Sequence, residues 1–91
     1  MELNTFTMNQ QIRRLKQQSA AASHCAHQLI IYKKELTMTW AGTEVGYLCS
    51  AIDLQIQKYE TLSIELDRLS RDMAQAVEDN IREGFAVSEG M

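Results

Sequence analysis

The chain contains no proline among its 91 residues, and its four glycines stand in only two places. Gly42 and Gly46 lie near the middle, and Gly84 and Gly90 lie near the end. Because proline is the strongest helix breaker and glycine the next, this distribution leaves two long stretches free of breakers. The sequence therefore predicts an all-α chain of two long helices joined at one central break.

An apolar stripe runs through the first half at alternating intervals of four and three residues. Such heptad spacing places side chains along one side of a helix, where they pack against another helix. The stripe consists of Met8, Ile12, Leu15, Ser19, Ala22, Ala26, Leu29, Lys33, Leu36 and Trp40. It predicts a first helix over about residues 5–39. Because the segment 19–23 is composed of small residues that let another backbone approach, we expect the closest helix contact there.

The second half repeats this spacing and predicts a second helix over about residues 44–83. Its stripe consists of Val45, Leu48, Ile52, Gln55, Tyr59, Leu62, Leu66, Leu69, Met73 and Ala76. Further apolar residues lie beside this stripe, which is more than one neighbouring helix covers, so we expect a second contact surface. They are Cys49, Ile56, Val77 and Ile81. Beyond Ile81 the pattern decays, and residues 84–91 are expected to form a flexible tail.

From the two stripes we select eleven large side chains as the expected helix–helix interface. They are Ile12, Leu15, Leu29, Leu36, Leu48, Ile52, Tyr59, Leu62, Leu66, Leu69 and Met73. Together they predict a single helical-hairpin domain over residues 1–91.

The residues between the stripes carry a helix stop followed by a helix start. Gly42 can adopt the left-handed conformation that ends a helix, Thr43 is a suitable N-cap, and Glu44 suits the positive first turn of the next helix. We therefore expect a tight turn over about residues 40–43. A connection this short makes the two helices antiparallel.

Charge and hydropathy exclude two classes of partner. The formal net charge is −3, and the nine Lys and Arg residues are spread along the chain, so no basic field attracts nucleic acid. The longest apolar run, residues 29–32, is far shorter than the roughly 20 residues needed to cross a bilayer, so we expect no membrane insertion. The first residues lack the pattern of a secretory signal peptide. Synthesis and folding in the cytoplasm are expected, with any export by another route.

The only cluster of metal-ligand residue types is His24, Cys25 and His27. On a helix Cys25 points about 100° away from His24, and a two-helix hairpin offers no concave site for catalysis. We therefore expect no enzyme, no catalytic residue, no metal and no cofactor, and a His/Cys metal-binding protein is a weak alternative. Cys25 and Cys49 lie roughly 15 Å apart along the hairpin axis, so both are expected to be free thiols.

This layout resembles the WxG (ESAT-like) family of small helical hairpins exported by type VII secretion systems. The resemblance rests on the length, on the absence of a signal peptide, and on Trp40 and Gly42 of a W-x-G motif placed at the only expected turn. It implies assembly of two hairpins into a four-helix bundle, followed by export of the folded complex.

Family members typically carry a second signal, a Tyr followed four positions later by an acidic residue. Here Phe85 and Glu89 match that spacing, with Phe in place of Tyr. On a helix the two side chains share one face, so they are the expected site of export or partner recognition. The Phe version resembles the small helical partners that escort LxG toxins into the same machine.

The leading hypothesis from sequence is an interaction protein that is a type VII substrate or a toxin partner and chaperone. It is expected to be a homodimer, or a heterodimer with a paralogous hairpin or with the helical N-terminal domain of a larger toxin. A type VII secretion ATPase is the expected second partner, and the secreted protein is expected outside the cell. The alternative is a stand-alone cytoplasmic coiled-coil adaptor whose W-x-G is coincidental.

Overall fold

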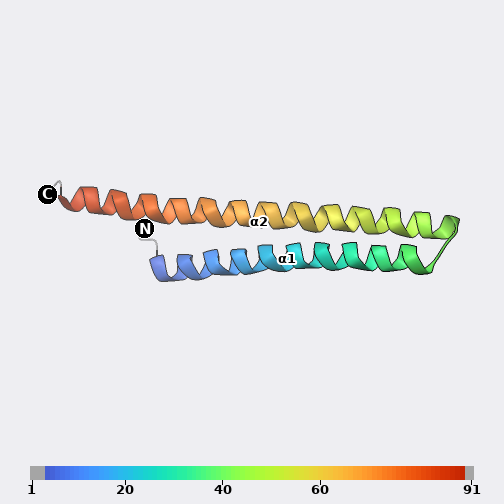
Figure 1. Ribbon diagram of the computed structural model, residues 1–91. Coiled ribbons are helices and arrows are strands. Elements are labelled where there is room, and N and C mark those ends of the chain that lie inside the picture. The colour runs from blue at the N-terminus through green and yellow to red at the C-terminus, as the bar shows by residue number, and fades with distance from the viewer. Residues whose placement is uncertain (1–3, 90–91) are drawn as a thin grey trace.

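Two long helices form an antiparallel hairpin (Figure 1). The computed structural model describes the backbone of residues 4–89 and the side chains of residues 4–83. Helix α1 spans Thr5–Thr39 and helix α2 spans Thr43–Glu89. The principal extents are 74 × 16 × 16 Å, so the molecule is a rod. The all-α hairpin predicted from sequence is confirmed.

Helix α1 has a side-chain cap at its start and an extended residue at its end. The Asn4 Oδ1 accepts a hydrogen bond of 3.2 Å from the Thr7 backbone N–H, which satisfies one of the first amides of the helix. At the other end Trp40 is extended, with φ −118° and ψ 144°. Its N–H still donates to the Leu36 carbonyl at 2.9 Å, so α1 closes its last turn before the chain leaves it.

The turn between the helices depends on Gly42, which has a φ of +129°. The sequence suggested that this glycine would end the first helix. Instead, α1 ends at the extended Trp40, and the positive φ of Gly42 redirects the chain into α2. Thr43, expected to be an N-cap, is the first residue of α2, and Glu44 lies in its positive first turn.

Helix α2 extends to Glu89, beyond the end expected near residue 83. A glycine in a helix costs only about 1 kcal/mol relative to alanine, so Gly84 does not stop a helix that no proline follows. The expected tail over residues 84–91 is thus helical as far as Glu89, and its side chains lie outside the described residues. With 47 residues against 35, α2 also runs past the start of α1 (Figure 1).

The apolar stripe of α1 faces α2 along the hairpin. Four of its residues are buried, namely Ile12, Ser19, Ala22 and Ala26. Five more are half-buried, namely Met8, Leu15, Leu29, Lys33 and Leu36. The last member of the stripe, Trp40, is 59% exposed at the turn.

In α2 every second residue of the stripe predicted from sequence lies outside the seam between the helices. The next residue in the chain is buried or half-buried in its place. Ile52, Tyr59, Leu66 and Met73 are half-buried, as the sequence stripe suggested. The residues that alternate with them are Cys49, Ile56, Ser63, Ser70 and Val77. Three leucines expected on this seam are half-exposed at its edge: Leu48 at 48%, Leu62 at 43% and Leu69 at 48%.

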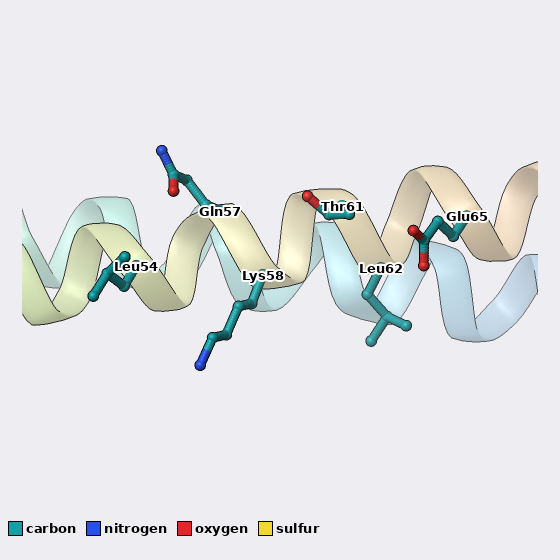
Figure 2. Close-up of a pocket in the computed structure, with 6 residues that line it drawn as sticks. All are labelled: Leu54, Gln57, Lys58, Thr61, Leu62 and Glu65. Carbon is teal, nitrogen blue, oxygen red and sulfur yellow. The ribbon is translucent and has the colours of Figure 1, made fainter.

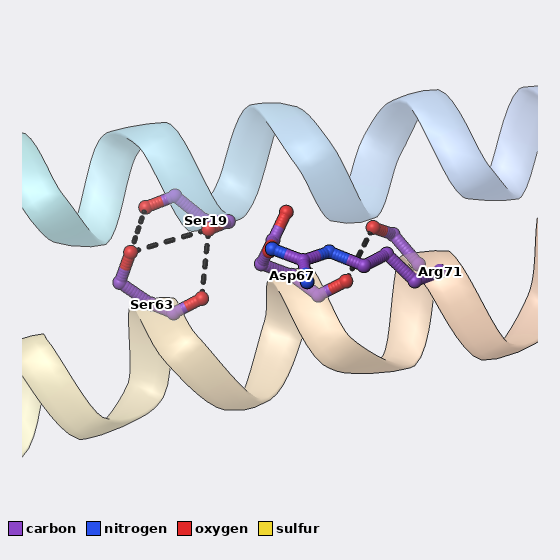
Figure 3. A network of polar contacts seen from close by, with 5 residues as sticks. Ser19, Ser63, Asp67 and Arg71 are labelled. Atoms are coloured by element: carbon purple, nitrogen blue, oxygen red, sulfur yellow. Dashed lines mark hydrogen bonds and ion pairs between the residues drawn. The ribbon is translucent and has the colours of Figure 1, made fainter.

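Small residues explain this displacement, because they let the two backbones approach (Figure 3). The Ser19 hydroxyl donates to the Ser63 carbonyl at 2.7 Å, and the Ser63 hydroxyl donates to the Ser19 carbonyl at 2.9 Å. Ser70 is fully buried and donates to the Asp67 carbonyl of its own helix at 2.7 Å. A leucine at position 63 does not fit at such a separation, so Leu62 lies at the edge of the seam, and Leu69 lies at the same edge beside the buried Ser70.

Candidate partner-binding surface

One long side of the hairpin carries two apolar hollows between the helices. The first measures about 350 Å³ and is lined by Gln18, Ala21, Ala22, Cys25, Tyr59, Leu62 and Leu66. The second measures about 390 Å³ and is lined by Cys25, Gln28, Leu29, Tyr32 and Tyr59. Cys25 and Tyr59 line both hollows, so the two form one continuous depression along this side.

The half-exposed leucines of α2 border the same side. Leu48 and Leu69 lie two heptads before and one heptad after Leu62, which places all three along one edge of the helix. We call this side of the hairpin the leucine face. Its defining residues are Cys25 and Tyr32 of α1, with Leu48, Leu62 and Leu69 of α2.

The opposite edge of α2 carries acidic residues between positions 53 and 67. There the Lys33 ammonium binds the Asp53 carboxylate at 2.7 Å, joining α1 to α2. The hydrogen bond to Asp53 raises the pKa of Lys33 above its ordinary value of 10.5. Glu60 and Asp67 follow Asp53 at seven-residue intervals, so this edge of α2 is acidic where the opposite edge carries leucines. The two edges of α2 beside the seam thus differ in polarity over this stretch, and the leucine edge is the one suited to a protein partner.

A third hollow lies on the outer side of α2 (Figure 2). It measures about 550 Å³ and is lined by Leu54, Gln57, Lys58, Thr61, Leu62 and Glu65. Lys58 and Leu62 point the same way in the close-up, and Gln57 points to the other side. Because Leu62 lines both this hollow and the first one, the apolar surface continues from the leucine face around α2.

The sequence-predicted recognition residues lie at the two ends of the rod. Trp40 is exposed at the turn, and Gly42 provides the positive φ beside it. Phe85 and Glu89 lie on the final turns of α2, where the backbone is helical and the side chains are outside the described residues. The hairpin therefore does not bring the two motifs together within one chain (Figure 1).

His24 and His27 are exposed on α1, and Cys25 is half-buried on the leucine face. Over the part of the chain with described side chains, no three His, Cys, Asp or Glu residues are grouped closely enough to hold a metal ion. Both cysteines are free thiols there, as the offset between them predicted. Within the same part, neither helix combines the length and the apolar character needed to cross a membrane.

Comparison of the chain with models of protein families, with curated proteins and with solved structures gave no match. Sequence reasoning found the exposed turn and expected a second contact surface. It did not identify the hollows beside Cys25, because it placed the neighbouring leucines inside the hairpin.

Proposed function

We propose that this protein is a binding protein that pairs its leucine face with another helical hairpin, and that it catalyses no reaction. The observation that carries the proposal is the row of half-exposed leucines beside the apolar hollows of Cys25 and Tyr59. Apolar side chains in this arrangement match the knobs and holes by which helices of four-helix bundles interlock.

The total exposed surface supports a partner. The chain exposes 7303 Å², whereas a globular monomer of 10.4 kDa exposes about 5,400 Å². The excess of about 1,900 Å² exceeds the roughly 800 Å² that each partner contributes to a standard protein interface. The hairpin therefore has enough exposed surface for one partner of the standard size.

We propose further that the protein is a substrate of a type VII secretion system, or the escort of a toxin into it. The support is the hairpin fold, the W-x-G at its turn, and the position of Phe85 and Glu89 one helical turn apart on α2. In this proposal the protein assembles in the cytoplasm, with a copy of itself, a paralogous hairpin or the helical domain of a toxin. The secretion ATPase then recognises the complex through the end of α2.

The exposure of Trp40 fits this proposal. Only part of the indole packs within the hairpin, and the rest is available to a partner. An aromatic side chain at a turn presents a large, rigid surface at a low cost in conformational entropy.

Export from the native cell tests the type VII proposal. The protein is expected in the culture supernatant when the secretion ATPase is intact and inside the cell when the ATPase is inactivated. The double variant with Phe85→Ala and Glu89→Ala is expected to stay inside, because both groups of the recognition patch are lost. The matched control is Glu83→Ala, which removes an exposed carboxylate from the same helix outside the motif.

Three results contradict this proposal. They are retention of the wild-type protein in cells with a working ATPase, export that continues without the ATPase, and normal export of the double variant. Retention together with a stable helical complex inside the cell indicates the cytoplasmic coiled-coil adaptor instead.

A further inference from the structure

On the outer side of α2, residues at equal distances from one midpoint are complementary in character. Around the midpoint between Thr61 and Leu62, Lys58 on one side is matched by Glu65 on the other, and Leu54 is matched by Leu69. At about 100° per residue, these six side chains fall within an arc of about 100° on the helix. We call them the α2 stripe.

The side chains of the α2 stripe are available to a partner. Leu54 is 59% exposed, Leu62 and Leu69 are half-exposed, and Lys58 and Glu65 are exposed. Five members of the stripe, together with Gln57, line the outer hollow of about 550 Å³ (Figure 2): Leu54, Lys58, Thr61, Leu62 and Glu65. The stripe thus combines apolar knobs, a hollow and two opposite charges.

We propose that the α2 stripe binds a second copy of this chain, with the two α2 helices antiparallel and a twofold axis between Thr61 and Leu62. In such a pair, residues at equal distances from the axis face each other. Leu54 then meets Leu69 of the second copy, and Lys58 meets Glu65 of the second copy. Each of these contacts occurs twice.

The charges select this arrangement over a parallel one. A parallel α2 pair in register places Lys58 against Lys58 and Glu65 against Glu65, which is repulsive at both levels. The antiparallel pair turns the same four charges into two ion pairs, each of which lies between the axis and a contact of Leu54 with Leu69.

The leucine face is continuous with the α2 stripe through Leu62, so a second copy placed on the stripe also approaches the hollow lined by Ala21, Ala22 and Cys25. The excess exposed surface of about 1,900 Å² is enough for such an interface on each copy. This inference rests on the proposed function in one respect, namely that the hairpin acts by pairing. It goes further by naming the partner, the register and the residues.

Charge reversal tests the register, with the oligomeric mass measured by sedimentation equilibrium and folding checked by circular dichroism. The wild-type chain is expected at twice its mass of 10.4 kDa. Lys58→Glu alone and Glu65→Lys alone each replace two ion pairs by two repulsive contacts. Each is expected to weaken the dimer by about tenfold or more with helix content unchanged.

Two combinations are expected to restore the dimer. In the double variant with Lys58→Glu and Glu65→Lys, the charges exchange places and attract again across the axis. An equimolar mixture of the two single variants is expected to form a mixed dimer, because each introduced charge then faces its opposite. The matched control is Glu60→Lys, which reverses an exposed charge on the other side of α2 and is expected to leave the dimer unchanged.

A wild-type chain that remains at 10.4 kDa up to about 100 µM overturns the inference, as does a dimer that ignores both reversals or that neither combination restores. These outcomes are separate from failure of the proposed function. A monomeric chain that is still exported with a different hairpin contradicts the second copy alone. A dimer that responds to the reversals but is never exported contradicts the secretion proposal alone.

Discussion

Ser19 and Ser63 set the distance between the two helices. Each hydroxyl donates to the backbone carbonyl of the other serine, and the two hydroxyl oxygens lie 3.2 Å apart (Figure 3). Such contacts form only when no side chain larger than serine lies between the backbones. The apolar seam on both sides of this point, with Ala22 and Ala26 on α1, depends on the same approach.

Substitution of Ser19→Leu is therefore expected to separate the helices. The larger side chain overfills a buried position, at a cost of about 1–3 kcal/mol of unfolding free energy. For a chain of this length, that lowers the melting temperature by roughly 4–8 °C per kcal/mol in thermal unfolding followed by circular dichroism.

The matched control for this substitution is Ser23→Leu, one turn further along α1 at an exposed position. Its effect is expected to stay within about 0.5 kcal/mol, because nothing packs tightly there. Equal melting temperatures for the two variants are incompatible with a close contact at Ser19.

Gly42 and Gly46 offer a second comparison at the residue scale, because a Cβ atom added to either meets no atom within 4 Å. The effect of each substitution on stability therefore depends on the backbone conformation alone. Gly42 has a φ of +129°, which residues with a Cβ rarely adopt, so Gly42→Ala is expected to lower stability by about 1–2 kcal/mol. Gly46 lies within α2, so Gly46→Ala is expected to raise stability by about 0.5–1 kcal/mol. Urea titration of both variants measures the sign, and a loss of stability at both positions contradicts this account.

At the scale of elements, the two helices differ in how far their packing follows from sequence. Helix α1 has one apolar stripe, and the periodicity alone identifies the side that faces α2. Helix α2 has apolar residues on both sides of Ile52 and Tyr59, and hydrophobicity favours the leucines at 62 and 69. In the structure the serines at 63 and 70 face α1 in place of these leucines. Ser63 is small enough for the backbone of α2 to come within hydrogen-bond distance of Ser19. Which residues of α2 face inward depends on α1, so it cannot be predicted from the periodicity of α2 alone.

The candidate site is also only partly predictable from the sequence. The exposed turn at Trp40 is predictable, since a W-x-G between two heptad stripes has one position in a hairpin. The leucine face is not predictable from α2 alone, because its residues become available only after Ser63 and Ser70 take the inner positions. Its extent therefore had to come from the structure.

The ion pair between Lys33 and Asp53 joins the two helices near the turn. We therefore expect the stability of the hairpin to depend on pH in the alkaline range. Because its folded pKa is raised, the stabilisation from Lys33 is fully present below the ordinary pKa of 10.5 and is lost as pH rises through the folded value. Lys33→Met is expected to lower the melting temperature at pH 8 and to have a diminishing effect toward about pH 12.

The control for this pH series is Lys34→Met, which removes an exposed lysine beside Lys33. A difference between the two variants that persists unchanged at high pH is inconsistent with the ion pair. Comparison of the two variants at each pH also cancels every other effect of pH that both variants share.

The whole molecule is long and thin, and this shape limits its core. Among the described residues, six apolar residues are buried, and two of them are alanines: Ile12, Ala22, Ala26, Val45, Ile56 and Val77. A core of this size is small for 91 residues, and such chains commonly gain the missing burial from a partner. Helix α2 also continues past the start of α1 (Figure 1), and Ile81, four residues after the buried Val77, is 54% exposed.

Because so much apolar surface lies outside the hairpin, folding and self-association are expected to be coupled. Binding that occurs only in the folded state stabilises that state by mass action, so the melting temperature rises with protein concentration. For a dimer that unfolds directly to two chains, a hundredfold increase contributes about 2.7 kcal/mol, which corresponds to a rise of roughly 5–10 °C. Thermal unfolding of the wild-type chain at about 1 µM and about 100 µM measures this shift, with the Lys58→Glu variant measured in parallel.

The variant is expected to have a lower melting temperature at both concentrations, because its dimer is weaker while its hairpin is intact. A wild-type melting temperature independent of concentration shows that the hairpin is stable on its own, and the core described above then suffices without a second copy.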